Sequence, residues 1–315
     1  MNQDNNIIQV IDVKKEFPKI VAVNNVSLCI KSNETLALVG ESGCGKTTLG
    51  KCILKLLKID SGKIIYRGDP IHNLPEVSFR PYRKRIQMLF QNPLTSFNPF
   101  YSIQASINEF CNLNDDLKEK GEIIKKIKYE MNRVGLSQRI LTSKPNELSG
   151  GQLQRAALVR TLIVEPELVV LDEPTSSLDM STRGQIINLL QDIQEQLKIG
   201  YLIISHDLRV IKTMAHRVLV MYLGEIVEET TTKKLFNNPF HPYSRALLEA
   251  ALLNINENET KDILKGEVTQ TSRNLIGCKL APRCQYAKEI CFQKKQELKE
   301  IEKDHFVRCW RAKDF

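Results

Sequence analysis

The stretch that decides the fold is GESGCGKTT at residues 40–48, which fits the pattern G-x-x-x-x-G-K-T. It follows TLALV at 35–39, which is typical of a buried strand. It leads into TTLGKCILKLL from Thr47, which predicts a helix with Leu49, Ile53 and Leu56 on one face. A glycine-rich turn between a strand and a helix directs backbone N–H groups at phosphate oxygens. We therefore predict a phosphate-binding loop in an α/β fold.

The residue types in this loop suit a nucleoside triphosphate with magnesium. Gly40 and Gly45 let the backbone curl, Lys46 reaches the β- and γ-phosphates, and the Thr47 hydroxyl coordinates Mg²⁺. The alternative is a chance match, which arises in about one per cent of chains of this length. The predicted nucleotide contacts of the loop are Gly40, Ser42, Gly43, Cys44, Gly45, Lys46, Thr47 and Thr48.

Polar side chains follow three further apolar runs. LVVLDEP at 168–174 ends in Asp172, which has the place of a magnesium-binding Walker B aspartate, and in Glu173, the candidate base for the attacking water. YLIISHD at 201–207 places His206 after a strand, facing the γ-phosphate. Gln91 in MLFQNP follows a shorter run and is a candidate contact to metal and water. Open α/β sheets bind ligands at these strand ends, so we expect an ATPase site.

Composition limits the other functions. A chain of 315 residues allows one large domain and a small extension. Its longest apolar runs fall far short of the ~20 residues of a membrane helix, and its start lacks the pattern of a secretory signal, so we expect it in the cytoplasm. The formal charge of +8 comes from basic residues interleaved with acidic ones. A nucleic-acid partner is not expected, because a binding footprint needs clustered charge.

The ordered series of motifs, with LSGGQ at 148–152 and SLD at 177–179, resembles the ATP-binding subunits of ABC transporters over residues 10–235. The resemblance implies a RecA-like P-loop core with a helical subdomain at about 92–160. It implies that Phe17 stacks on adenine, although phenylalanine is also an ordinary core residue. It also implies that two such domains face each other head to tail, so that each signature caps the ATP of the other.

The signature turn is therefore expected to be half of a site that a second ATPase subunit completes. Ser149 precedes QLQRAALVRTLI, which predicts a helix, and a helix N-terminus with glycines binds phosphate well. The resemblance puts Asp179 in the loop that links the two sites. The predicted contacts to the partner's nucleotide are Ser149, Gly150, Gly151 and Gln152, with Asp179 beside them.

The C-terminal part resembles a subgroup. NPFHPYSRALLEA at 238–250, GCKLAPRCQYAKEIC at 277–291 and VRCW at 307–310 are similar to the extension of oligopeptide and dipeptide importer subunits, as is NPLTSFNP at 92–99. This implies an ATPase domain at 1–235 and an extension at 236–315. It implies a peripheral subunit on the cytoplasmic face of the cell membrane. The expected partners are a second ATPase subunit, two transmembrane permease subunits and an extracytoplasmic substrate-binding protein. The subgroup favours a related but distinct ATPase subunit, with a second copy of this chain as the alternative.

Other readings remain open. Nickel, metallophore and glutathione importers are built from similar subunits. A soluble, redox-regulated or nucleic-acid-associated ABC ATPase is a further alternative, although the chain has neither a long inserted coiled coil nor a second ATPase unit.

Four cysteines crowd into the extension with the spacing C-x5-C-x6-C-x17-C, at Cys278, Cys284, Cys291 and Cys309. The resemblance implies a 4Fe–4S iron–sulfur cluster on these four thiolates. Zinc on the same thiolates and a set of buried free thiols are the alternatives. His305 is not expected to be a ligand. Because the ATPase motifs lie elsewhere in the sequence, we expect basal nucleotide binding to survive replacement of Cys284 by serine.

Overall fold

The computed structural model describes residues 6–112, 120–252 and 275–314. The chain divides into two compact units. The helical unit comprises Met1–Ile7, Lys31–Asn33 and Asn73–Leu202, and the sheet unit comprises Ile8–Ile30, Glu34–His72 and Ile203–Phe315. Residues 253–274 of the predicted extension and 113–119 of the predicted helical subdomain lie outside the described residues.

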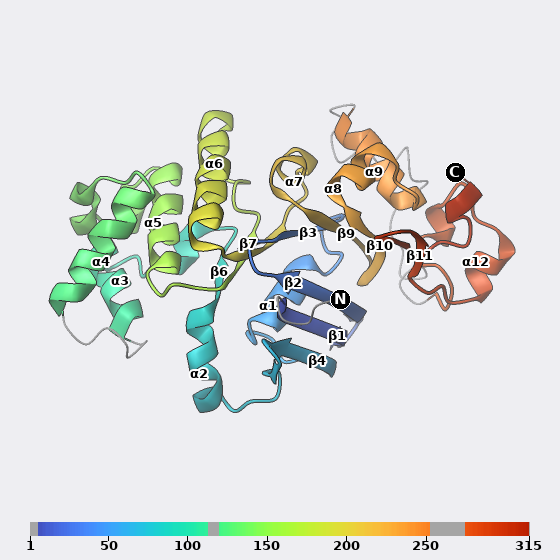
Figure 1. Cartoon of the computed structure of the whole chain (residues 1–315), viewed down its shortest axis with the longest axis horizontal. Coiled ribbons are helices and arrows are strands. Elements are labelled where there is room, and N and C mark those ends of the chain that lie inside the picture. Colours follow the sequence, from blue (N-terminus) through green and yellow to red (C-terminus); the bar gives the residue numbers. More distant parts are fainter. Residues whose placement is uncertain (1–5, 113–119, 253–274, 315) are drawn as a thin grey trace. The chain divides into compact units, whose positions relative to one another are not determined.

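The helical unit is built on two parallel strands, β6 and β7, with Leu89 opposite Leu171. All five residues of β7 are buried. Helix α5 contacts α3, α4, α6 and β6, and α3, α4 and α5 lie together in Figure 1. The elements are α2 (Glu76–Arg85), β6 (Ile86–Leu89), α3 (Ile103–Asn112), α4 (Lys120–Arg133), α5 (Gly150–Leu162), β7 (Leu168–Asp172) and α6 (Met180–Leu197), with short 3-10 helices at Pro93–Ser96, Gln138–Thr142 and Pro145–Glu147.

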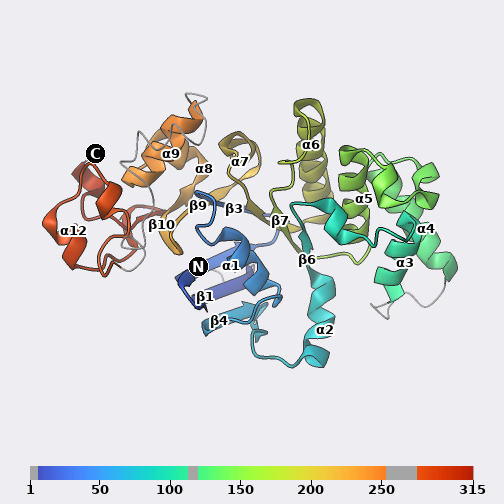
Figure 2. The ribbon, with the colours of Figure 1, turned by 180° about the vertical axis from the view of Figure 1, so that it is seen from behind.

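The sheet unit contains a four-stranded sheet in the order β2-β1-β4-β5. Strands β1 (Asn6–Phe17) and β2 (Ile20–Lys31) are long, and β1 pairs antiparallel with β4 (Ser61–Tyr66), as Figure 2 shows from behind. Strand β5 (Asp69–Pro70) is its short edge.

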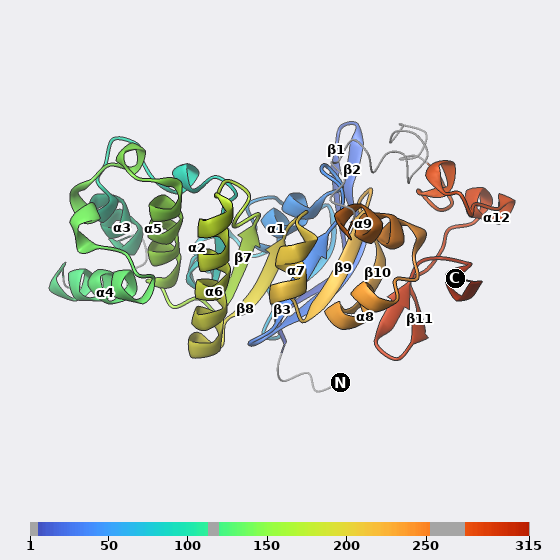
Figure 3. The ribbon, with the colours of Figure 1, turned by 90° about the horizontal axis from the view of Figure 1, so that it is seen from above.

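Three other strands of this unit, β3, β9 and β10, are paired with one another, and the phosphate loop follows β3. Strand β3 (Thr35–Val39) pairs in parallel with β9 (Arg217–Tyr222), and β9 pairs antiparallel with β10 (Glu225–Thr231). Helices α7 (Leu208–Met214), α8 (Thr232–Asn237) and α9 (Pro242–Leu252) accompany these strands. Helix α8 packs on β9 and β10, and α7 packs on β3 and contacts α8 and α9, an arrangement that Figure 3 shows from above. Strand β8 (Gly200–Ile204) runs across the boundary between the two units.

The predicted strand, turn and helix at 35–57 are present, but the helix is shorter than predicted. Helix α1 (Lys46–Ile53) buries Leu49 and Ile53. It ends before Leu56, which is 45% exposed. The prediction for Leu56 was wrong because Lys55 takes a left-handed φ of 54°, which turns the chain out of the helix.

The described part of the extension continues the sheet that contains β3, β9 and β10. Strand β12 (His305–Val307) pairs antiparallel with β10, and β11 (Lys299–Glu302) pairs with β12. A small apolar cluster of Phe240, Val307 and Ala312 lies beside these strands. Cys284 directly follows the short helix Ala281–Arg283, and Cys291 lies on α12 (Glu289–Gln293). Among the described residues, no helix combines the length and apolar character needed to cross a membrane.

Candidate functional site

The phosphate loop has the shape that its glycines were expected to allow. Gly45 has a φ of 111°, and a Cβ there would lie 2.0 Å from the Ala22 carbonyl oxygen. Gly40 has a φ of 152°, and a Cβ there would lie 2.1 Å from the Met221 carbonyl oxygen. At both positions φ is positive and a Cβ atom would collide with a carbonyl oxygen, so each position requires glycine.

Lys46 lies inside the curl of the loop. Its side chain is buried, and its Nζ donates to the carbonyl oxygens of Gly40 at 2.6 Å and Glu41 at 2.8 Å. Cys44 is buried beside it, and burial raises the pKa of this thiol despite the neighbouring Lys46. Cys44 is therefore a neutral packing residue, and the ammonium of Lys46 is the positive charge that the loop offers to phosphates.

The other predicted loop contacts are accessible to a ligand. Ser42 and Gly43 are exposed, and Thr47 and Thr48 are partly buried in the first turn of α1. The first backbone N–H groups of a helix have no partner within it, so this turn suits an anion. Phe17, at the end of β1, is 43% exposed and has Lys15 Nζ 5.5 Å from its ring centroid, so it is not a core side chain.

His206 follows the end of β8 within the sheet unit. The Ser205 backbone N–H donates to the Leu38 carbonyl of β3 at 3.4 Å, and the next residue, His206, is exposed. The histidine thus follows a strand end bonded to β3, the strand that leads into the phosphate loop.

In the helical unit, the register of β6 and β7 brings two predicted residues together. Gln91 lies two residues beyond Leu89, and Glu173 lies two beyond its partner Leu171. Gln91 Nε2 donates to Glu173 Oε2 at 2.9 Å. Glu173 also has a φ of 47°, an unusual conformation outside glycine that costs about 1–3 kcal/mol and clusters at functional sites. Asp172 is buried at the end of β7.

The signature turn begins a helix, as the sequence predicted. Ser149 caps α5 by accepting from the Gln152 N–H at 3.3 Å, and Gln152 Oε1 accepts from the Ser149 N–H at 3.0 Å. Ser149, Gly150 and Gln152 are exposed. A Cβ on Gly151 would lie 2.7 Å from Thr182 Cγ2 of α6, so this glycine allows α5 and α6 to approach closely.

Asp179 has a structural task that the motif did not reveal. One carboxylate oxygen accepts from the N–H groups of Ser181 and Thr182, and the other accepts from the Thr182 hydroxyl. Hydrogen bonds from the Ser181 hydroxyl, and then from Thr182, lower the pKa of Asp179 well below its usual range. The residue is the N-cap of α6 and stays ionised in that role.

The four cysteines of the extension line a single pocket, together with His241, Tyr286 and Arg311. Burial raises the pKa of Cys278 to about 12 and that of Cys309 to about 11. Within residues 6–112, 120–252 and 275–314, no three His, Cys, Asp or Glu side chains lie close enough together to hold a metal ion. The four thiols share this pocket. His305 instead contacts Glu228 at 2.6 Å.

Sequence reasoning missed one set of contacts around the loop. The Glu41 N–H donates to the Tyr243 hydroxyl at 2.7 Å, and Arg283 Nη1 lies 3.2 Å from a Glu41 carboxylate oxygen. Sequence separations of 202 and 242 residues leave no local signal for such contacts. They link two residues after position 235 directly to the phosphate loop.

A strand, a glycine-rich loop and a helix that enclose a buried lysine define a P-loop nucleotide-binding protein. Residues 23–176 match the ABC transporter family, and residues 227–291 match the family described as oligopeptide/dipeptide transporter, C-terminal region. The chain is 40% identical to the oligopeptide transport ATP-binding protein AppF of Bacillus subtilis, over 96% of each chain. It is 37% identical to the dipeptide transport ATP-binding protein DppF of Haemophilus influenzae, again over 96% of each.

Among solved structures, the ATP-binding cassette MJ0796 bound to ADP and Pi matches with a TM-score of 0.64 and 27% identity, over 71% of this chain and 98% of that one. The chain belongs to the ABC transporter family of ATP-binding proteins. The prediction of an α/β ABC ATPase from its motifs is confirmed.

Proposed function

We propose that this ATPase powers the import of oligopeptides or dipeptides through separate membrane subunits. The match of residues 227–291 to the oligopeptide/dipeptide transporter C-terminal region carries the proposal. The curated relatives that cover nearly the whole chain are named for oligopeptide or dipeptide transport. Nickel, metallophore and glutathione importers remain the alternatives within the same family.

The chain's own residues suit hydrolysis in the following roles. Lys46 leaves the Gly40 and Glu41 carbonyls to bind the β- and γ-phosphates, because phosphate oxygens attract an ammonium more strongly than carbonyl oxygens. Glu173 accepts a proton from the attacking water, and Gln91 orients its carboxylate. His206 contacts the γ-phosphate, and Phe17 stacks on adenine.

Magnesium fits the oxygen donors at hand, a hydroxyl and a carboxylate. Thr47, Asp172 and Gln91 would hold it, and when bound it neutralises charge on the phosphates.

The signature turn serves the nucleotide of a second ATPase subunit, and we favour a related but distinct subunit over a second copy of this chain. Ser149, Gly150, Gly151 and Gln152 bind that partner's phosphates through the N-terminus of α5, with Asp179 beside them. Exposure of Ser149, Gly150 and Gln152 supports this role.

The helical unit carries an apolar surface for the membrane subunits. Phe100 is 80% exposed, with Leu94 at 46% and Tyr101 at 45% in the same short segment. Large exposed apolar side chains mark interaction sites. We propose that two transmembrane permease subunits dock here, which places the chain peripherally on the cytoplasmic face of the membrane. An extracytoplasmic binding protein would then supply the substrate.

The domain division follows the sequence families. Residues 1–235 form the ATPase domain, with the helical subdomain at about 92–160, and 236–315 form the extension. The start of the C-terminal family match at residue 227 supports a boundary near this point.

The four cysteines of the extension suit a 4Fe–4S cluster, because four thiolates are the ligand set that this cluster takes. Their shared pocket supports the proposal. Zinc and free thiols are the alternatives. Iron and zinc analysis of protein purified without oxygen distinguishes them: about four irons per chain supports the cluster, and stoichiometric zinc without iron rejects it.

Transport in proteoliposomes tests the main proposal. The chain is reconstituted with its cognate second ATPase, permeases and binding protein, and ATP hydrolysis is measured with peptides, glutathione or nickel complexes. We expect several-fold stimulation and substrate uptake with peptides. Stimulation by glutathione or a nickel complex alone would favour the alternative, and no stimulation by any substrate would contradict a role in import.

A further inference from the structure

Glu41, the second residue of the phosphate loop, is held from outside the loop by two side chains that follow the ATPase motifs in sequence. Its backbone N–H donates to the Tyr243 hydroxyl at 2.7 Å. Its carboxylate pairs with Arg283, whose Nη1 lies 3.3 and 3.2 Å from the two oxygens. Tyr243 lies on α9, and Arg283 ends the short helix Ala281–Arg283.

Tyr222 joins these two contacts into one cluster. It ends β9, the strand that pairs in parallel with β3, so it lies level with the start of the loop. The rings of Tyr222 and Tyr243 have centroids 4.7 Å apart, and Arg283 Nη1 also donates to the Tyr222 hydroxyl at 3.3 Å. Tyr243 is fully buried, and burial raises its pKa well above the usual range, so its hydroxyl stays neutral.

A second set of contacts reaches the loop from the same region. Buried Lys279 donates to the Leu223 carbonyl at 2.8 Å in the turn between β9 and β10. The next residue in that turn, Gly224, donates its N–H to the Cys44 carbonyl at 2.8 Å. The extension thus bonds directly to Glu41 and, through this turn, supports Cys44.

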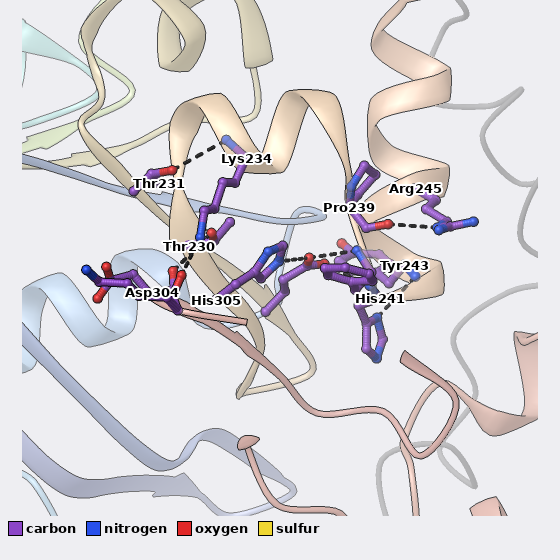
Figure 4. A network of polar contacts seen from close by, with 12 residues as sticks. Thr230, Thr231, Lys234, Pro239, His241, Tyr243, Arg245, Asp304 and His305 are labelled. Atoms are coloured by element: carbon purple, nitrogen blue, oxygen red, sulfur yellow. Dashed lines mark hydrogen bonds and ion pairs between the residues drawn. The ribbon is translucent and has the colours of Figure 1, made fainter. Parts of the chain in front are cut away.

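The start of α9 is itself fixed, which gives Tyr243 a defined position. Buried Glu228 of β10 accepts from the N–H groups of Phe240 and His241 and contacts His305 of β12. The Tyr243 N–H donates to His241 Nδ1 at 3.1 Å. Figure 4 shows this network, in which β10, β12 and α9 converge.

These contacts act on the backbone that surrounds Lys46. The Glu41 residue that Tyr243 and Arg283 hold also presents its carbonyl oxygen to Lys46 Nζ at 2.8 Å. A loop whose first turn is fixed before the nucleotide arrives loses less conformational entropy on binding.

We propose that Tyr243 and Arg283 are positioning residues for ATP, which hold the phosphate loop in its binding shape through Glu41. The C-terminal region is then a working part of the nucleotide site. The proposal needs only ATP binding by the loop, so a failure of peptide import would leave it intact.

Tyr243→Phe tests it, because the change removes the hydroxyl and keeps the ring. ATP affinity and steady-state kinetics are measured on the full chain in its transporter complex. We expect about tenfold weaker ATP binding and a raised KM with kcat within twofold, since one buried amide loses its partner. The matched control is Tyr201→Phe, whose hydroxyl is buried and donates to the Leu190 carbonyl at 3.1 Å in the helical unit.

Two results would overturn the proposal. One is ATP affinity of Tyr243→Phe within twofold of the Tyr201→Phe control. The other comes from Glu41→Gln, Arg283→Gln and the double variant, which also decide the matter if Tyr243→Phe does not fold. We expect each single change to weaken ATP binding about threefold and the double change to do no more than either. Effects that multiply, or no effect of either single change, would show that the pair does not position the loop.

Discussion

The chain has two glycine-containing turns that begin helices, and its own residues surround them very differently. The phosphate loop is enclosed at its base: Gly40 and Gly45 lie against the backbone of β9 and β2, Lys46 is buried, and Glu41 is held by Tyr243 and Arg283. The signature turn is open: Ser149, Gly150 and Gln152 are exposed, and the side chains of Ser149 and Gln152 each accept from the other residue's backbone N–H. Enclosure suits a site that binds its ligand with the chain's own groups, and exposure suits a surface that another molecule completes.

The largest expected effect on the rate of ATP hydrolysis comes from Glu173, which lies in neither turn. It tests whether this residue is the base for the attacking water. Glu173→Gln should keep ATP binding and lower turnover by about 10² to 10⁴, because the amide keeps its shape but cannot accept a proton. Steady-state ATPase rates and equilibrium ATP binding are measured side by side. A rate within threefold of wild type would reject Glu173 as the base.

Paired glycine variants test the contrast between the turns directly. Gly45→Ala should weaken ATP binding by this chain at least about a hundredfold, because its Cβ would lie 2.0 Å from a carbonyl oxygen at a positive φ. Gly150→Ala is the matched control, since its Cβ would make an ordinary contact at 3.6 Å with Leu178. Equal loss of binding in both variants would contradict the comparison.

The smallest effect concerns the support behind the enclosed loop. Burial alone would raise the pKa of Glu228, but the hydrogen bond from His305 and those from the start of α9 lower it. A carboxyl whose folded pKa is lowered contributes stability above its unfolded value, near pH 4, and this stability is lost as the pH falls further. Glu228→Gln should therefore destabilise the fold at pH 7 by about 2 kcal/mol and flatten the acid limb of the stability curve.

Glu229→Gln provides the control on the same strand. Its carboxylate pairs with Arg217 at 2.6 Å but is partly exposed. It should cost at most about 1 kcal/mol. Urea unfolding between about pH 2 and pH 8 measures both variants, so that the range includes the acid limb. Equal destabilisation by the two would show that the buried network around Glu228 has no special importance.

Local sequence predicted much of the fold and the candidate site. The strand before the loop, the glycines of the loop and the helix that Ser149 caps all follow from spacing and residue type within a few positions. The parallel register of β6 and β7 then explains why Gln91 and Glu173, each after an apolar run, come into contact. The ends of these strands can be predicted because the apolar run and the polar residues that follow it are adjacent in the sequence.

The rest depends on contacts between distant parts of the chain. Arg283 lies 242 residues from Glu41 in the sequence, yet their side chains pair. Asp179 was assigned from its motif alone, and its service as the cap of α6 appears only with the geometry of Ser181 and Thr182. The helix after the loop was predicted too long, because a left-handed residue at Lys55 has no strong sequence signal.

The central claim is that the enclosed loop and the open turn serve two different nucleotides. Ser149→Arg tests it most directly, in an assembled transporter where each ATPase subunit is photolabelled with a nucleotide analogue. A bulky cation at the exposed turn should disable hydrolysis at the partner's phosphate loop and leave labelling of this chain's own loop largely intact. Loss of labelling confined to this chain's own loop would contradict the claim.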